Sequence, residues 1–209
     1  MRKADDAAAL TLQRLQAACR TCTRCVEDGF LEEANPTFAG SAGATFFLVG
    51  QAPGQVERET RRPFSGRAGR ELARWMVRAG FESDEEFRSQ TYIAAVMRCF
   101  PGRLPSGKGD RRPPPGPVAN CSHWLDAELQ LLKPRVLIPV GQLAIERFLG
   151  AGPLEERVGR SFGEDPVVVP LPHPSGQSRW LNSAANRARL DAALRLLFEL
   201  RKECLTERS

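Results

Sequence analysis

Four short apolar runs, separated by segments with helical spacing, constrain the fold of this chain more than any other feature. The runs cover residues 45–50, 91–97, 136–140 and 166–171, and polar residues do not alternate within them. Such runs are typical of strands that are buried on both faces of a parallel sheet. The alternation predicts an α/β protein: a three-layer α/β/α sandwich around a four-stranded parallel sheet.

Helices are predicted between the runs. Helical spacing is found in residues 7–18, 67–80, 118–132, 142–149 and 184–202. Residues 101–117 contain six prolines and four glycines, which predict an irregular loop. We expect one domain over residues 1–209, with an N-terminal helix and cysteine cluster at 1–44 and a basic Gly/Pro loop at 100–117.

The charge balance is weakly informative about partners. The chain has 30 Lys and Arg against 25 Asp and Glu, a net charge of +5. This balance fits a polyanion such as DNA, although many basic proteins never bind nucleic acid. No apolar stretch reaches the roughly 18 residues that a membrane span needs, and residues 1–16 lack the apolar core of a signal peptide. We expect a cytoplasmic monomer without membrane contact.

The chemically rich segments follow the predicted strands directly. Residues 51–54, 98–99 and 173–175 each lie just beyond the carboxyl end of an apolar run. Ligands of open α/β sheets bind at that edge. The candidate site is therefore expected where these three segments meet.

Four ordered motifs at these positions resemble family 4 of the uracil-DNA glycosylase superfamily. The match runs from about Cys22 to about Leu197. Its parts are Gly50-Gln51-Ala52-Pro53-Gly54 with Glu57 and Arg62-Pro63-Phe64-Ser65-Gly66-Arg67-Ala68-Gly69, then residues 92–99, then Lys133-Pro134 with 136–141, and finally His173-Pro174-Ser175. The resemblance implies a monofunctional DNA glycosylase, which flips a damaged or modified base out of DNA and hydrolyses its N-glycosidic bond to leave an abasic site.

The resemblance also implies roles for the pocket residues. His173 would donate to the departing base anion, while Gln51 and Glu57 would lie near the water and the sugar. Phe64 would stack on the flipped base. Further base contacts are expected from Ala52, Pro53, Gly54 and Ala95. Taken alone, Phe64 also fits a core residue, His173 a residue of a surface loop and Glu57 a solvated acid.

Two segments are candidates for DNA contact. Residues 176–181 occupy the position of the loop that wedges into the duplex, with Ser175, Gln177, Arg179 and Trp180 as expected contacts. A buried structural tryptophan is the alternative for Trp180. In the basic loop, Arg111 and Arg112 are expected to bind phosphates, and a disordered, solvated loop is the alternative.

Six cysteines in a cytoplasmic protein indicate metal binding or catalysis before disulfides. The resemblance assigns Cys22, Cys25, Cys99 and Cys121 to a 4Fe–4S cluster, and four thiolates would equally hold zinc. Cys19 and Cys22 form an overlapping C-x-x-C pair, which leaves the register of the ligands open.

Two residues depart from the family pattern. Gln51 stands where family 4 has Glu, and Ala95 stands where family 4 has the Asn that reads uracil. A pocket without that amide loses a discriminating hydrogen bond and gains room. We therefore expect uracil, a deaminated base or a bulkier modified base as the substrate. The alternatives are a catalytically weak binding protein for damaged or modified DNA on the same scaffold and a zinc-stabilised nucleic-acid-binding domain.

Overall fold

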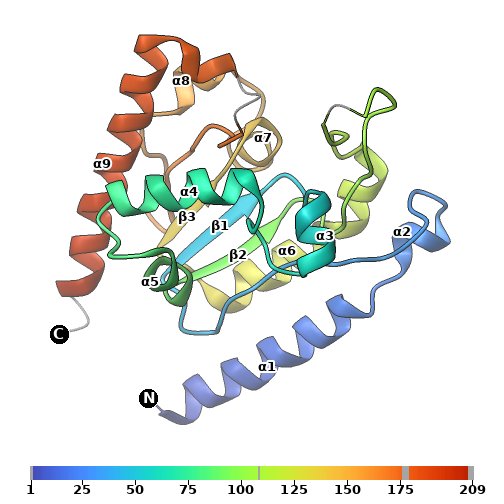
Figure 1. Cartoon of the computed structure of the whole chain (residues 1–209). Coiled ribbons are helices and arrows are strands. Elements are labelled where there is room, and N and C mark those ends of the chain that lie inside the picture. Colours follow the sequence, from blue (N-terminus) through green and yellow to red (C-terminus); the bar gives the residue numbers. More distant parts are fainter. Residues whose placement is uncertain (1, 108, 176–178, 207–209) are drawn as a thin grey trace.

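The fold is built around a four-stranded, fully parallel sheet (Figure 1). The computed structural model describes residues 2–107, 109–175 and 179–206. The sheet has the order β2-β1-β3-β4. Its strands are β1 (Phe46–Gly50), β2 (Thr91–Ala95), β3 (Val136–Pro139) and β4 (Val167–Val168). The predicted architecture is confirmed.

Strand β1 lies in the middle of the sheet, and its side chains are buried on both faces. Phe46 and Leu48 belong to one apolar cluster, whereas Phe47 and Val49 belong to the other. This alternation follows from the two-residue period of a strand. It explains why the sequence of β1 is apolar without interruption.

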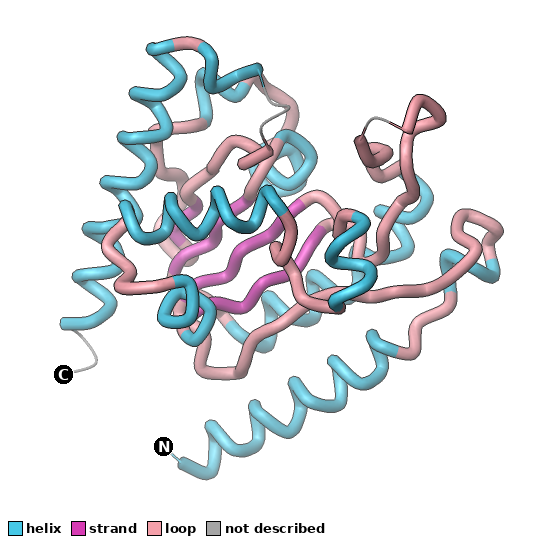
Figure 2. Tube along the Cα trace, viewed as in Figure 1, coloured by secondary structure: helices cyan, strands magenta, loops and turns pink. Residues whose placement is uncertain are grey.

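Helices cover both faces of the sheet and complete the three layers (Figure 2). The first cluster, on the face of Phe46, takes apolar side chains from α4 (Arg67–Arg78) and α9 (Ala184–Thr206). The second takes them from α1 (Arg2–Arg20) and α6 (Pro115–Leu132). Burial of apolar surface stabilises a fold by roughly 25 cal/mol per Å², so the two clusters stabilise the sheet from both faces.

Short helices connect the layers. They are α2 (Arg24–Glu27), α3 (Gln55–Thr60), α5 (Asp84–Ser89), α7 (Gln142–Leu149), α8 (Leu154–Arg157) and the 3₁₀ helix η1 (Arg179–Asn182). Of these, only α7 was predicted, because the other five have four to six residues, too few to show an apolar period. None of the helices that the structure describes is long and apolar enough to cross a membrane.

Some predicted boundaries were wrong. The fourth strand has only two ladder residues, although a parallel bridge from Val140 to Leu171 continues the pairing. Helix α6 begins at Pro115, three residues before the predicted start, because proline is well suited to a first helical turn. The basic loop is also more ordered than its composition indicates: an antiparallel bridge joins Arg103 to Asp110.

Candidate active site

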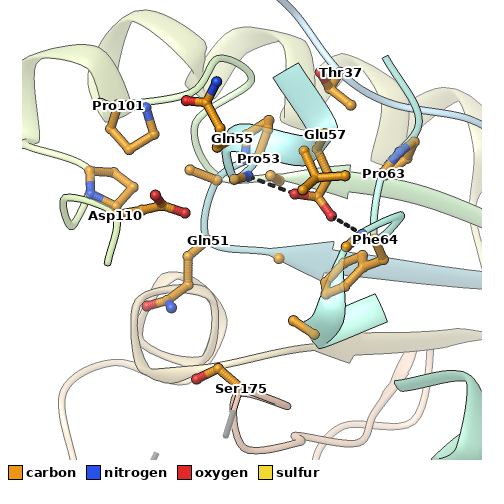
Figure 3. Close-up of a pocket in the computed structure, with 18 of the residues that line it drawn as sticks. Thr37, Gln51, Pro53, Gln55, Glu57, Pro63, Phe64, Pro101, Asp110 and Ser175 are labelled. Carbon is orange, nitrogen blue, oxygen red and sulfur yellow. Dashed lines mark hydrogen bonds between the residues drawn. The ribbon is translucent and has the colours of Figure 1, made fainter. Parts of the chain in front are cut away.

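A cavity of about 660 Å³ opens at the carboxyl ends of β1 and β2 (Figure 3). This is the edge at which the sequence predicts the site. Most of the predicted pocket residues line it: Gln51, Ala52, Pro53, Gly54, Glu57, Phe64, Ala95, Arg111, Arg112, His173 and Ser175. The structure thus brings together segments that lie more than one hundred residues apart in the sequence.

The carboxylate of Glu57 joins two loops of the pocket wall. Its Oε2 accepts a hydrogen bond from the backbone N–H of Gly54 at 3.1 Å, and its Oε1 accepts from the N–H of Gly66 at 2.7 Å (Figure 3). Gly54 precedes α3 and Gly66 precedes α4. Both oxygens therefore hold the starts of two helices, which is a structural task in addition to any chemical one.

Phe64 is held in a strained backbone conformation at the pocket. Its φ is 52°, in the left-handed region that non-glycine residues rarely adopt. The Arg88 guanidinium donates to the carbonyls of Pro63 and Phe64, each at 3.0 Å. A Cβ at Gly50 would lie 3.1 Å from the Phe64 ring, so glycine lets the ring lie against β1. The ring is both packed on the core and part of the pocket wall.

The imidazole of His173 is oriented by its own loop. Its Nδ1 accepts the backbone N–H of Ser175 at 3.3 Å. A nitrogen that accepts carries no proton, so the neutral ring carries its proton on Nε2. Burial lowers the pKa of His173, and the charge of Glu57 opposes that shift. The result is a neutral Nε2–H donor at the pocket.

The side chain of Gln51 is used by the neighbouring helix. Its Oε1 accepts the backbone N–H of Leu143 at 3.3 Å, in the first turn of α7. A Cβ at Gly141 would lie 3.1 Å from the Gln51 carboxamide, which explains the glycine at that point. Gln51 still lines the cavity, but its amide oxygen is directed to the start of α7 (Figure 3).

Ala95 forms the pocket wall at the end of β2. It pairs in register with Gly50 of β1 and is only 6% exposed. Neither residue has a polar side chain. The wall of β1 and β2 therefore offers the ligand apolar surface where the family pattern would place an amide.

Asp110 was not predicted as a site residue. It comes from the basic loop, lines the same cavity and lies close to Gly54: a Cβ there would be 3.0 Å from Asp110 Oδ2. Burial raises the pKa of Asp110, Arg103 lowers it, the charge of Glu57 raises it, and the backbone N–H of Gln55 lowers it. A lone acid among four basic residues was the only signal in the sequence.

The expected DNA contacts fall into two groups. Arg111 and Arg112 lie at the cavity, and Arg112 pairs with Glu146 at 3.0 Å. The Trp180 indole donates to Glu155 at 2.6 Å and its ring packs against the core, which favours the structural role that the sequence left open. Arg179 is exposed at the start of η1. Gln177 lies outside the described residues.

Two of the predicted cysteine ligands, Cys99 and Cys121, share a small buried cluster that packs against Ala52 of the pocket wall. Three sulfur atoms accept hydrogen bonds: Cys99 from Asn35 N–H at 3.3 Å, Cys121 from Arg98 N–H at 3.4 Å, and Cys25 from Asn120 Nδ2 at 3.8 Å. N–H donors around sulfur are typical of metal-bound thiolates. Among the described residues, however, no three Cys, His, Asp or Glu side chains are arranged closely enough to hold a metal ion as they stand.

A buried ion pair adjoins the cysteines and was not predicted. Arg98, next to Cys99, pairs with Glu128, and their side chains are 1% and 0% exposed. Tyr92 donates to the same carboxylate at 2.8 Å. Two nitrogens of Arg98, Nε and Nη1, are buried without a hydrogen-bond partner in the described structure. Burial, the largest influence, raises the pKa of Cys19, and the nearby Arg98 charge opposes that shift.

The fold and the site define an α/β protein with a cavity at its strand ends, lined by an aromatic ring, a histidine and two carboxylates. A family model of the uracil DNA glycosylase superfamily matches residues 38–197. The chain belongs to this superfamily.

The chain is similar to several curated proteins named type-4 uracil-DNA glycosylase. The protein of Thermotoga maritima is 30% identical over 140 residues, which cover 65% of this chain and 67% of the relative. That of Pyrobaculum aerophilum is 30% identical over 140 residues, covering 67% and 65%. That of Sulfurisphaera tokodaii is 28% identical over 133 residues, covering 63% and 55%. The chain thus spans between about half and two thirds of the length of these relatives.

Proposed function

We propose that this chain is a monofunctional DNA glycosylase that extrudes uracil or a related base and hydrolyses its N-glycosidic bond. The observation that carries the proposal is the hydrogen bond from Ser175 N–H to His173 Nδ1, which leaves the Nε2–H as a donor for a pocket walled by Phe64. Breaking the bond leaves negative charge on the base and oxocarbenium character on the sugar. On the base side, the Nε2–H of a neutral histidine stabilises that anion by donating a hydrogen bond to it.

The carboxylates serve the sugar side of the same reaction. Water attacks C1′ of the deoxyribose, the bond from C1′ to the base nitrogen breaks, and its electron pair leaves with the base. Asp110 lines the cavity close to Gly54 and would orient this water and accept its proton. Burial raises the pKa of its carboxyl, which makes the carboxylate a stronger base. Glu57 keeps the loops of the pocket in position and adds negative charge beside the sugar.

The four cysteines Cys22, Cys25, Cys99 and Cys121 hold a 4Fe–4S cluster in this proposal. The N–H donors at three of the sulfur atoms fit this group, and the names of the relatives place the chain beside type-4 enzymes. The cluster would tie α2 and the start of α6 to the end of β2 and take no part in the hydrolysis. Absorbance near 400 nm with about four irons per chain would support it; one zinc per chain would instead favour the zinc-stabilised domain.

DNA is the partner in this proposal, held through the arginines of the basic loop. Arg103, Arg111 and Arg112 surround the mouth of the cavity, where phosphates of a bound strand would pass. We also infer that the chain works as one domain and as a monomer. A single species of about 23 kDa by light scattering would support the latter.

A substrate panel tests the function. Oligonucleotides that carry uracil, hypoxanthine, xanthine or hydroxymethylcytosine are incubated with the protein and then cleaved with alkali. We expect strand breaks with uracil and none after His173→Ala, while DNA affinity is retained. Tight binding without breaks on any base would favour the alternative of a catalytically weak binding protein. A stronger signal with a larger base than with uracil would support the roomier pocket at Ala95.

A further inference from the structure

The basic loop folds as a hairpin that projects from the body of the domain. Leu104 N–H donates to Gly109 O at 3.0 Å, Gly107 N–H donates to Leu104 O at 2.8 Å, and Arg111 N–H donates to Gly102 O at 2.8 Å. Figures 1 and 2 show the segment between β2 and α6 standing away from the sheet and its helices. These hydrogen bonds hold the described part of the hairpin in one conformation; Lys108 lies outside the described residues.

The base of the hairpin belongs to the pocket, whereas Leu104, further along the hairpin, is an exposed apolar residue. Arg103, Asp110 and Arg111 line the cavity. The side chain of Leu104, the residue after Arg103, is 42% exposed. A single exposed leucine is ordinary on a protein surface. This one differs because it is carried on a hairpin between Arg103 and Arg111, which both line the cavity.

In residues 176–181, the segment expected to wedge into the duplex, the apolar side chains are those of Trp180 and Leu181, and both pack against the core. The sequence between Ser175 and Arg179 is Gly-Gln-Ser. The next aromatic residue, Trp180, is bonded to Glu155 and packs against the core. A glycosylase of this fold therefore needs another residue to occupy the space that an extruded base leaves.

We propose that Leu104 inserts into the base stack of duplex DNA when the target base is extruded, while Arg103 and Arg111 hold the adjacent phosphates. This proposal rests on the proposed function. An apolar side chain placed between bases offsets part of the cost of unstacking them. Single-stranded DNA has no such stack to maintain, so the contribution of Leu104 is specific to duplex substrates.

The test compares duplex and single-stranded uracil substrates. Leu104→Ala is expected to lower kcat/KM on the duplex by about tenfold or more and to leave the single-stranded value within about twofold. Leu104→Phe should keep most of the duplex activity. Val77→Ala, at an exposed apolar residue of α4 outside the pocket, is the matched control and should change neither value. Equal values for Leu104→Ala and wild type on the duplex, or equal losses on both substrates, would overturn the proposal.

A binding measurement keeps insertion testable even if no excision is found. A duplex with 2-aminopurine beside the target base gains fluorescence when the base stack opens. We expect the gain with wild type and Val77→Ala, and its loss with Leu104→Ala. An equal gain with Leu104→Ala would refute insertion, whereas absence of strand breaks with a Leu104-dependent gain would reject only the glycosylase.

Discussion

The two hydrogen bonds of the Glu57 carboxylate, called the Glu57 clamp below, allow a quantitative prediction about stability and activity together. Its two oxygens accept the N–H groups of Gly54 and Gly66 at 3.1 and 2.7 Å. Glu57→Gln keeps one acceptor and turns the other into a donor that faces an N–H. One hydrogen bond to a charged group contributes about 1.5–3 kcal/mol. We expect Glu57→Gln to lower the free energy of unfolding by about 2 kcal/mol, since one hydrogen bond is lost. Glu57→Ala removes both hydrogen bonds and should lower it by about 4 kcal/mol, a cost that is limited because water in the open cavity rehydrates part of the freed amides.

The assay is urea unfolding followed by circular dichroism, with excision rates measured on the same preparations. A loss of about 2 kcal/mol is a large share of a total stability of roughly 5–15 kcal/mol, so the midpoint should shift clearly. Glu59→Gln is the matched control. It lies on the same helix, is exposed and accepts a hydrogen bond from Gln55 Nε2 at 2.7 Å, and we expect less than about 0.5 kcal/mol there.

The excision rate separates the clamp from chemistry. If Glu57 acts through the loops, Glu57→Gln loses stability and activity together, and added osmolyte restores part of both. An unchanged urea midpoint with a hundredfold or greater loss of excision would refute the clamp. Glu57 would then act directly on the sugar or the water.

Three further predictions concern His173, the pocket wall at Ala95 and the buried ion pair of Arg98 and Glu128. At pH 7, ¹⁵N NMR should show His173 as the neutral Nε2–H tautomer, and an imidazolium at that pH would contradict this. Because the pKa of His173 is lowered in the native state, its contribution to the free energy of unfolding is fully present above the ordinary pKa of 6.5 and is lost as the pH falls through the native pKa. Ala95→Asn should raise the preference for uracil over larger bases by tenfold or more in competition assays, and an unchanged ratio would show that β2 does not read the base. Arg98→Met should cost about 3–5 kcal/mol in urea unfolding, and a double change with Glu128→Leu should recover most of it; no recovery would mean that the cost comes from the cysteine site.

The sheet, and the location of the site at the carboxyl ends of its strands, were predictable because they depend on local patterns. Apolar runs of strand length identify β1 and β2, and parallel strands must present their carboxyl ends at one edge. The short helix α3 was not predicted, and the fourth strand, predicted over residues 166–171, has only the two residues of β4. Their residues are held by tertiary contacts such as the Glu57 clamp, which leave no periodic trace in the sequence.

The site was predictable as far as its motifs extend. His173 and Phe64 are at the cavity as expected, but the Nδ1 bond to Ser175 and the positive φ of Phe64 are visible only in three dimensions. Asp110 and the Arg98–Glu128 pair were missed for a common reason. An acid is recognisable as functional only once its burial and its neighbours are known.

The substitution of Gln51 for the family's glutamate and the position of Asp110 explain one another. The carboxamide of Gln51 accepts an N–H at the start of α7, so its oxygen is engaged away from the sugar. Glu57 has both oxygens on backbone amides. In the proposed reaction, Asp110 is therefore the carboxylate left to act on the attacking water, and it lines the pocket because the hairpin folds back onto Gly54 and Gln55. The hairpin that would carry Leu104 outward to the duplex also carries Asp110 inward to the cavity, so one hairpin would couple entry into DNA to completion of the catalytic group.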